Sequence, residues 1–459
     1  MIDFDKNCDI KVSFLYEGNR KIPSFLINSK VFEGKLDQSY IDVKSKRVYI
    51  GLGNKKSDKM ALFKSVVSGI KSLEKLEYEK IYIDLKNISK NDIFFVVESV
   101  FFASHSLSMK SKDIKKEKTF VFDHKFGEIV KRAHTIASVR NYVRDLVDMP
   151  SNILTTKGLV DSLIERLNNL KNLDIEVWDY NRIIAEKMEG IISVGKGSSN
   201  KPYFVKIKYE PKSYTKTVSL IGKGIVFDSG GLSLKSSDSM LDMKGDMAGA
   251  ATVIGLIELA TRFNIPLKIN AYIPIAENMV SGSSYKIGDV IKYKNGKTVE
   301  ITNTDAEGRL ILADAIIEAN NDDSHLIIVI ATLTGACMVA LGTSIYGVFS
   351  SNDRIGKEMV DFINIKTSEK AWLLPLFEPY KENLKSKICD LKNSASTRWG
   401  GAINAALFLK DFVDKKEFIH LDIAGPFYDD GIGLIDKMAT GIPLESLFLF
   451  LSSKMELLP

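Results

Sequence analysis

The chain has 459 residues, of which 45% are hydrophobic and 26% are charged, the usual balance of a globular protein. Its 63 basic and 58 acidic residues leave a formal net charge of +5, which is too small and too scattered for a dedicated nucleic-acid surface. The three cysteines show no CxxC spacing, and the first residues lack the order of a signal peptide, so a cytoplasmic location is expected.

The first part of the chain, residues 1–125, is predicted to form a small N-terminal α/β domain, because a chain of this length is expected to hold two domains. Short β-branched and aromatic runs predict strands at 47–51, 80–85 and 118–122. Apolar residues at helical spacing predict helices at 57–76 and 91–102.

Residues 126–148 are predicted to form a long linker helix, which ends there because Pro150 restricts the residue before it. Residues 149–459 then alternate strands and helices, which predicts a larger C-terminal α/β domain with a mostly parallel central sheet covered on both faces. Strands are expected at 173–178, 203–209, 217–221, 267–273 and 325–330, and helices at 247–262, 308–319 and 402–413.

The most apolar long stretch is 326–349. It contains several threonines and glycines, so we interpret it as a buried strand followed by a turn-rich loop. A membrane helix is the weaker alternative.

Three polar segments follow predicted strands. Lys223 follows the strand at 217–221, Asp305 follows a strand at 298–302, and 332–335 follows the strand at 325–330. Sites in open α/β sheets lie beyond the carboxyl ends of the strands, so we expect these segments to converge.

Charged residues on glycine-flanked turns gather between 223 and 309. They comprise four acids, two lysines and an arginine: Asp228, Asp246, Asp305, Glu307, Lys223, Lys235 and Arg309. Carboxylates suit magnesium, manganese or zinc, and two dications would remove the repulsion among four converging acids. Asp305 and Glu307 are two positions apart, so in an extended segment both would point to the same side.

Other interpretations of this segment remain open. The acids could be turn residues or helix caps, and Lys223 could form a salt bridge with Asp228. A two-metal phosphoesterase would use similar carboxylate pairs, whereas a nucleotide-binding loop is weakly supported and a zincin is excluded because HExxH is absent.

The stretch 303–310, Asn-Thr-Asp-Ala-Glu-Gly-Arg-Leu, resembles in full the signature of the leucine aminopeptidase family of dinuclear metallopeptidases. The resemblance covers most of 144–445, and its further segments are 223–235, Asp246, 277–279 with 288–289, 332–335, 390–393 and 420–425. It implies two divalent ions, manganese or zinc and possibly magnesium. Asp228 and Glu307 would bridge them, Lys223 and Asp246 would complete one position, and Asp305 the other.

The resemblance also implies the remaining roles. Lys235 would stabilise the developing gem-diolate, and Arg309 would hold a bicarbonate that acts as general base. The substrate-binding residues would be Met243, Asn303, Thr332, Leu333, Gly335 and Ala424, although core packing is an alternative for Met243.

The implied protein is a homohexameric aminopeptidase that releases leucine or other apolar N-terminal residues from peptides in intracellular turnover. No membrane association is expected. A DNA-binding role, as in some members of the family, is an alternative that the near-balanced charge supports little.

Overall fold

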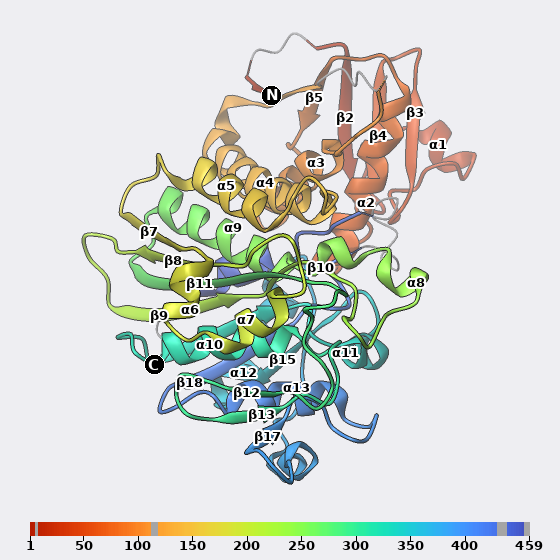
Figure 1. The fold of residues 1–459 in the computed structure, drawn as a ribbon. Helices are drawn as coiled ribbons and strands as arrows, with labels where there is room; N and C mark the ends of the chain where they lie inside the picture. The colour runs from red at the N-terminus through yellow and green to blue at the C-terminus, as the bar shows by residue number, and fades with distance from the viewer. Residues whose placement is uncertain (5–7, 112–117, 429–437, 454–459) are drawn as a thin grey trace. The chain divides into compact units, whose positions relative to one another are not determined.

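The computed structural model describes residues 1–4, 8–111, 118–428 and 438–453 (Figure 1). The chain forms two compact units, of which the smaller holds residues up to Asn141 together with Ile365–Glu369. Both units combine helices with mostly parallel sheets, which confirms the predicted α/β class.

The smaller unit contains a six-stranded sheet in the order β1-β6-β5-β2-β4-β3. All neighbouring strands run parallel except the edge strand β3, which is antiparallel to β4. The strands are β1 (Ile2–Asp3), β2 (Ile10–Leu15), β3 (Ser39–Asp42), β4 (Arg47–Gly51), β5 (Lys80–Asp84) and β6 (Thr119–Val121). The helices are α1 (Ser24–Asn28), α2 (Lys59–Lys71) and α3 (Ile93–Ser104).

The predicted linker helix is α4, Gly127–Asp148, a single helix of 22 residues. The division between the two compact units falls inside it, after Asn141. The domain boundaries at 125 and 148 therefore stay predictions from the sequence.

The larger unit is built on a nine-stranded sheet with the order β16-β15-β18-β14-β9-β11-β8-β7, and β10 also pairs with β11. The central strands β18, β14, β9 and β11 are parallel, whereas β15, β8 and β7 run antiparallel to a neighbour. The strands are β7 (Leu173–Trp178), β8 (Tyr203–Tyr209), β9 (Lys216–Gly222), β10 (Gly224–Asp228), β11 (Leu267–Asn278), β14 (Leu326–Ala331), β15 (Tyr346–Ser350), β16 (Ala371–Leu373) and β18 (Glu417–Asp422).

Helices cover both faces of this sheet, with α9 (Ala248–Phe263) on one side and α10 (Gly308–Ala319) on the other (Figure 1). Helix α9 packs closely on the strands, because a Cβ atom on Gly249 would lie 2.1 Å from the carbonyl oxygen of Ile330. Helix α10 shares an apolar core with alternate residues of β14, such as Ile327 and Val329. The other helices are α5 (Thr156–Leu167), α6 (Tyr180–Ala185), α7 (Glu189–Gly195), α8 (Ser237–Met240), α11 (Gly335–Leu341), α12 (Asp353–Lys366), α13 (Gly401–Lys410) and α14 (Leu444–Ser453).

A third, three-stranded sheet joins β12 (Val290–Lys292), β13 (Thr298–Glu300) and β17 (Leu391–Lys392). The strand expected at 298–302 is β13, so it belongs to this small sheet rather than to the central one. The residues after β13 and those after β17 thus leave the same sheet side by side, since these two strands are parallel neighbours.

The apolar stretch 326–349 is more ordered than predicted. After β14, the chain forms α11 and then β15 in place of a turn-rich loop. Thr334 begins the helix, since its hydroxyl accepts a hydrogen bond from the backbone N of Cys337 at 3.0 Å. Among the described residues, no helix combines the length and the apolar character that a membrane span requires.

Candidate metal centre

Several polar residues lie at the carboxyl ends of neighbouring strands in the larger unit. Lys223 follows β9, Asp228 is the last residue of β10, and Thr332 follows β14. Asp305 and Glu307 reach the same place from the loop between β13 and α10. The expected convergence of three segments is therefore present, although one of them leaves a different sheet.

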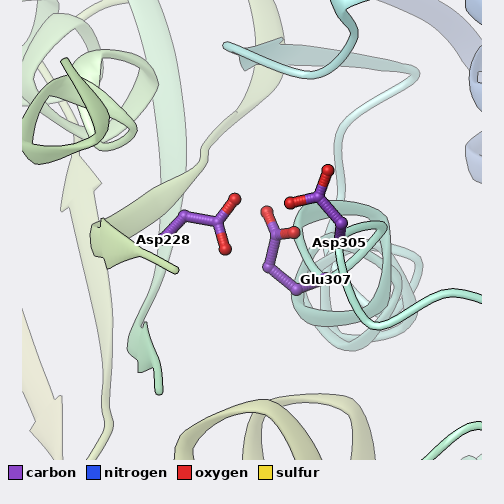
Figure 2. Close-up of side chains that lie close together, drawn as sticks. All are labelled: Asp228, Asp305 and Glu307. Carbon is purple, nitrogen blue, oxygen red and sulfur yellow. The ribbon is translucent and has the colours of Figure 1, made fainter. Parts of the chain in front are cut away.

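Figure 2 shows the carboxylates of Asp228, Asp305 and Glu307 facing one another. One oxygen from each lies within 4.8 Å of the others. Glu307 has φ −74° and ψ −38°, so the segment turns into α10 and is not extended as predicted. Glu307 is the N-cap residue of α10, and its carboxylate still faces that of Asp305 (Figure 2).

Lys223 occupies a buried position beside two of the acids. Its Nζ lies 2.7 Å from Asp246 Oδ1 and 3.0 Å from Glu307 Oε1, and it donates to the carbonyl oxygen of Thr332 at 3.0 Å. A Cβ atom on Gly308 would lie 2.4 Å from Lys223 Cε, so a side chain at 308 would displace the lysine.

Lys235 lies between the other two acids. Its Nζ is 2.9 Å from Asp228 Oδ2, and it also pairs with Asp305. The second oxygen of Asp228 accepts hydrogen bonds from the backbone N of Gly230 at 2.9 Å and from Asn278 Nδ2 at 2.8 Å. Gly230 has φ +84°, a conformation that favours glycine.

Burial and mutual repulsion strongly perturb these groups. Burial, with Asp228 close by, raises the pKa of Glu307 to about 8, and burial raises the pKa of Asp246 to about 6. Burial alone would lower the pKa of Lys223, but the surrounding carboxylates outweigh it and raise that pKa. Protein groups therefore favour the ammonium form of Lys223, and only further positive charge among these acids would reverse the balance.

Two carboxylate oxygens show whether this site suits a cation. Asp246 Oδ2 and Glu307 Oε2 are buried and have no hydrogen-bond partner among the described residues. Buried carboxylate oxygens are nearly always bonded, and hard oxygen donors are what divalent cations prefer. The donor set therefore fits a divalent metal ion.

Arg309 is a buried residue of α10 and follows Glu307 closely in the sequence. Its Nη1 donates to the carbonyl oxygen of Asn393 at 2.7 Å, whereas Nε has no hydrogen-bond partner within the described ranges. Burial lowers the pKa of Arg309 to about 10, so the side chain stays cationic near neutral pH. Burial likewise lowers the pKa of His420 to about 4, which leaves that imidazole neutral.

Three of the predicted substrate-binding residues touch the candidate metal ligands. Thr332 donates its hydroxyl to Asp246 Oδ1 at 2.7 Å, and Asn303 Oδ1 accepts from the backbone N of Asp305 at 2.9 Å. The carbonyl oxygen of Met243 accepts from the backbone N of Asp246 at 3.4 Å.

Two of the other three predicted substrate-binding residues, Leu333 and Ala424, contact a buried acid at the end of β18. Asp422 Oδ1 accepts from the backbone N atoms of Leu333 at 3.3 Å and Ala424 at 3.2 Å, so these two residues are neighbours. Its Oδ2 accepts from the hydroxyl of Thr334 at 2.7 Å. Gly335 is the exposed first residue of α11, and within the described residues it makes no hydrogen bond to the carboxylate cluster.

Sequence reasoning assigned no role to three residues that support the site: Asn278, Asn393 and Asp422. All three lie in segments that carry the family resemblance. That location was the only signal, because each residue acts through backbone hydrogen bonds or a single side-chain contact rather than through a recognisable ligand spacing.

Residues 141–448 match the pattern of the cytosol aminopeptidase family, catalytic domain. This chain belongs to that family. The resemblance found from the motifs is thereby confirmed, and the members of the family are metal-dependent exopeptidases of the hydrolase class. The probable cytosol aminopeptidase of Persephonella marina is 37% identical, over 88% of this chain and 84% of that protein. The probable cytosol aminopeptidase of Fusobacterium nucleatum is 33% identical, over 95% of this chain and 93% of that protein. That of Rhodopirellula baltica is 42% identical, over 70% of this chain and 63% of that protein.

Solved structures agree with this placement. The bottromycin maturation enzyme BotP superposes with a TM-score of 0.89 at 29% identity, covering 98% of this chain and all of BotP. The cytosol aminopeptidase of Coxiella burnetii superposes with a TM-score of 0.86 at 27% identity, covering 99% of each chain. A further structure of BotP contains manganese.

Proposed function

We propose that this chain is an aminopeptidase that uses two divalent ions to release N-terminal residues from peptides, preferably leucine or other apolar residues. The observation that carries the proposal is the cluster of Asp228, Asp305 and Glu307, in which one oxygen of each residue lies within 4.8 Å of the others. Buried oxygens of Asp246 and Glu307 have no hydrogen-bond partner among the described residues. The manganese in a BotP structure favours manganese, with zinc or magnesium as alternatives.

The residues would divide between two ion positions. Asp228 and Glu307 would be shared, Lys223 and Asp246 would complete one position, and Asp305 would complete the other. The negative charges of four carboxylates would balance the positive charges of two dications. The two lysines alone would leave two carboxylates without a compensating charge. Bound ions of this kind supply Lewis acidity to the scissile carbonyl and to water.

Lys235 and Arg309 would act as fixed positive charges. The carboxylates around Lys235 raise its pKa despite partial burial, so it remains an ammonium group. It would stabilise negative charge that develops on the substrate carbonyl oxygen. Arg309 keeps one buried N–H without a partner among the described residues, which suits an anion such as the bicarbonate proposed as general base.

The peptide would bind beside the cluster, on Met243, Asn303, Thr332, Leu333, Gly335 and Ala424. Asp422 ties Leu333 to Ala424, so two of the lining segments form one wall. The side chains of Met243, Leu333 and Ala424 are apolar, which would favour leucine-like first residues. We further propose a homohexamer that acts in cytoplasmic peptide turnover, for which light scattering on the purified chain is the direct test of assembly.

Recognition of the free amino terminus separates an exopeptidase from an endopeptidase. The acids of the cluster are committed to cations, so the substrate amine must itself bind an ion in its neutral form. Leu-Gly-Gly should therefore lose its first residue, whereas acetyl-Leu-Gly-Gly should not be cut measurably. Comparable cleavage of both peptides would overturn the proposal, and a panel of aminoacyl amides, with and without added manganese, would rank the preferred first residue.

A further inference from the structure

Asn393 closes the loop that carries Asp305. This asparagine follows β17, is fully buried, and lies beside the residues that follow β13. Its Oδ1 accepts from the backbone N of Thr302 at 2.8 Å and of Asn303 at 3.2 Å. Its Nδ2 donates to the carbonyl oxygen of Asn303 at 2.6 Å. One amide group thus both donates to and accepts from the backbone of a segment 90 residues away.

The same residue also reaches the arginine at the site. The carbonyl oxygen of Asn393 accepts from Arg309 Nη1 at 2.7 Å, and its backbone N donates to Glu300 at 3.0 Å. Asn303, which Asn393 holds by both backbone groups, in turn accepts from the backbone N of Asp305 through its own side chain at 2.9 Å. The contacts of Asn393 therefore lead to a candidate metal ligand in two steps.

An amide is the side chain that this position requires. Residues 301–304 form neither helix nor strand, so Asn303 cannot bond its backbone through regular secondary structure. An aspartate at 393 could accept from the two backbone N–H groups, but it could not donate to the Asn303 carbonyl oxygen. An alanine would leave all three partly buried backbone groups without this partner.

We propose that Asn393 is a positioning residue that holds the 302–306 loop so that Asp305 can complete a cation site, and that it thereby sets the affinity of the chain for a divalent ion. The inference rests on the proposed function, since it takes Asp305 to be a ligand. Partners outside the direct ligands of a metal typically contribute about 10- to 100-fold in affinity, because they orient the ligands.

The test is calorimetric titration of the metal-free full-length chain with MnCl₂. Asn393→Ala and Asn393→Asp should each weaken one of the two manganese steps, that of the position which Asp305 completes, by about 10- to 100-fold. The matched control is Asn404→Ala, because Asn404 on α13 is also fully buried and donates to a backbone carbonyl, that of Trp399 at 3.2 Å. The control should lower the melting temperature and leave both manganese steps unchanged.

The outcomes separate this inference from the proposed function. A wild-type chain that binds fewer than two manganese ions would contradict the two-ion proposal, whatever the variants do. A wild-type chain that binds two ions, with the same affinities in a folded Asn393→Ala variant, would overturn the positioning role alone. If neither variant at 393 folds, Asn393 is a structural residue and the inference is wrong.

Discussion

Buried carboxylates are treated in opposite ways in the two units. Asp92, in the smaller unit, pairs with Lys59 and accepts from the hydroxyls of Tyr16 and Ser89. Burial alone would raise its pKa, but Lys59 and the two hydroxyls outweigh burial and hold that pKa below its ordinary value. Glu307 has a similarly small exposed fraction but lies deeper below the surface, and its pKa rises to about 8.

The difference has two causes, the greater depth of Glu307 and the number of partners that each acid has. Asp92 has its own lysine, whereas Asp228, Asp246, Asp305 and Glu307 share two lysines. A buried acid whose oxygens all have partners stabilises the fold and has no oxygen left for a metal ion. Acids that compete for too few partners leave carboxylate oxygens without one, and only a proton or an added cation would satisfy these oxygens. This shortage of partners distinguishes the candidate metal centre from a structural ion pair.

Removing Glu307 should have the largest effect, because its carboxylate would be shared between the two proposed ion positions. Glu307→Ala should lose manganese affinity by more than the roughly 100-fold that outer partners give, and peptidase activity with it. Elemental analysis of the purified variant measures this. Two ions retained per chain would show that Glu307 is not a shared ligand.

Removing Lys235 should affect the reaction more than binding. If its ammonium group stabilises the transition state, Lys235→Ala should lower kcat by about 10²-fold, with a smaller change in KM. Steady-state kinetics on a leucine amide provide the measurement, with metal content as the control. A near-normal kcat, or loss of the ions, would contradict the assigned role.

Protons and cations should compete at this cluster. Because the pKa values of Asp246 and Glu307 are raised to about 6 and about 8, an incoming ion must displace protons in this range. Manganese affinity should therefore rise between pH 6 and pH 8, by about tenfold per pH unit for each proton displaced. Calorimetry in buffers of different ionisation enthalpy counts those protons, and an affinity independent of pH would show that the ion displaces none.

The stability of the metal-free chain should change with pH in the opposite direction to its manganese affinity. Glu307 keeps its proton in the folded state up to about pH 8, whereas its ordinary pKa is 4.5, so its contribution to stability declines as pH rises between these values. Asp92 acts in reverse, since its lowered pKa adds stability that is lost only as pH falls through that pKa. With chelator present, the melting temperature of Glu307→Gln should fall less with rising pH than that of the wild type does.

The smallest effect on the metal centre is expected from Asp92→Asn. This change removes the charge that Lys59 pairs with, and it should cost about 1.5–3 kcal/mol in the free energy of unfolding. Manganese affinity and kcat should not change. Chemical denaturation checks the first expectation and calorimetry the second, and a loss of manganese binding would show that the smaller unit influences the site.

The sequence by itself determined the α/β class and the set of charged residues. Strand β14, for example, is a continuous apolar run because both faces of the sheet are covered. The acids and lysines can be recognised from the sequence because they stand at fixed spacings on glycine-flanked turns. In this chain they lie between Lys223 and Arg309.

Only the tertiary structure decided how these residues meet. Strand β13 pairs outside the central sheet, and Glu307 reaches the cluster from a helical turn, which no local pattern distinguishes from an extended segment. Asn393 and Asp422 were assigned no role because they act through backbone hydrogen bonds to distant segments. Such bonds depend on which strands become neighbours, and long-range pairing is not encoded in the periodicity of a single stretch.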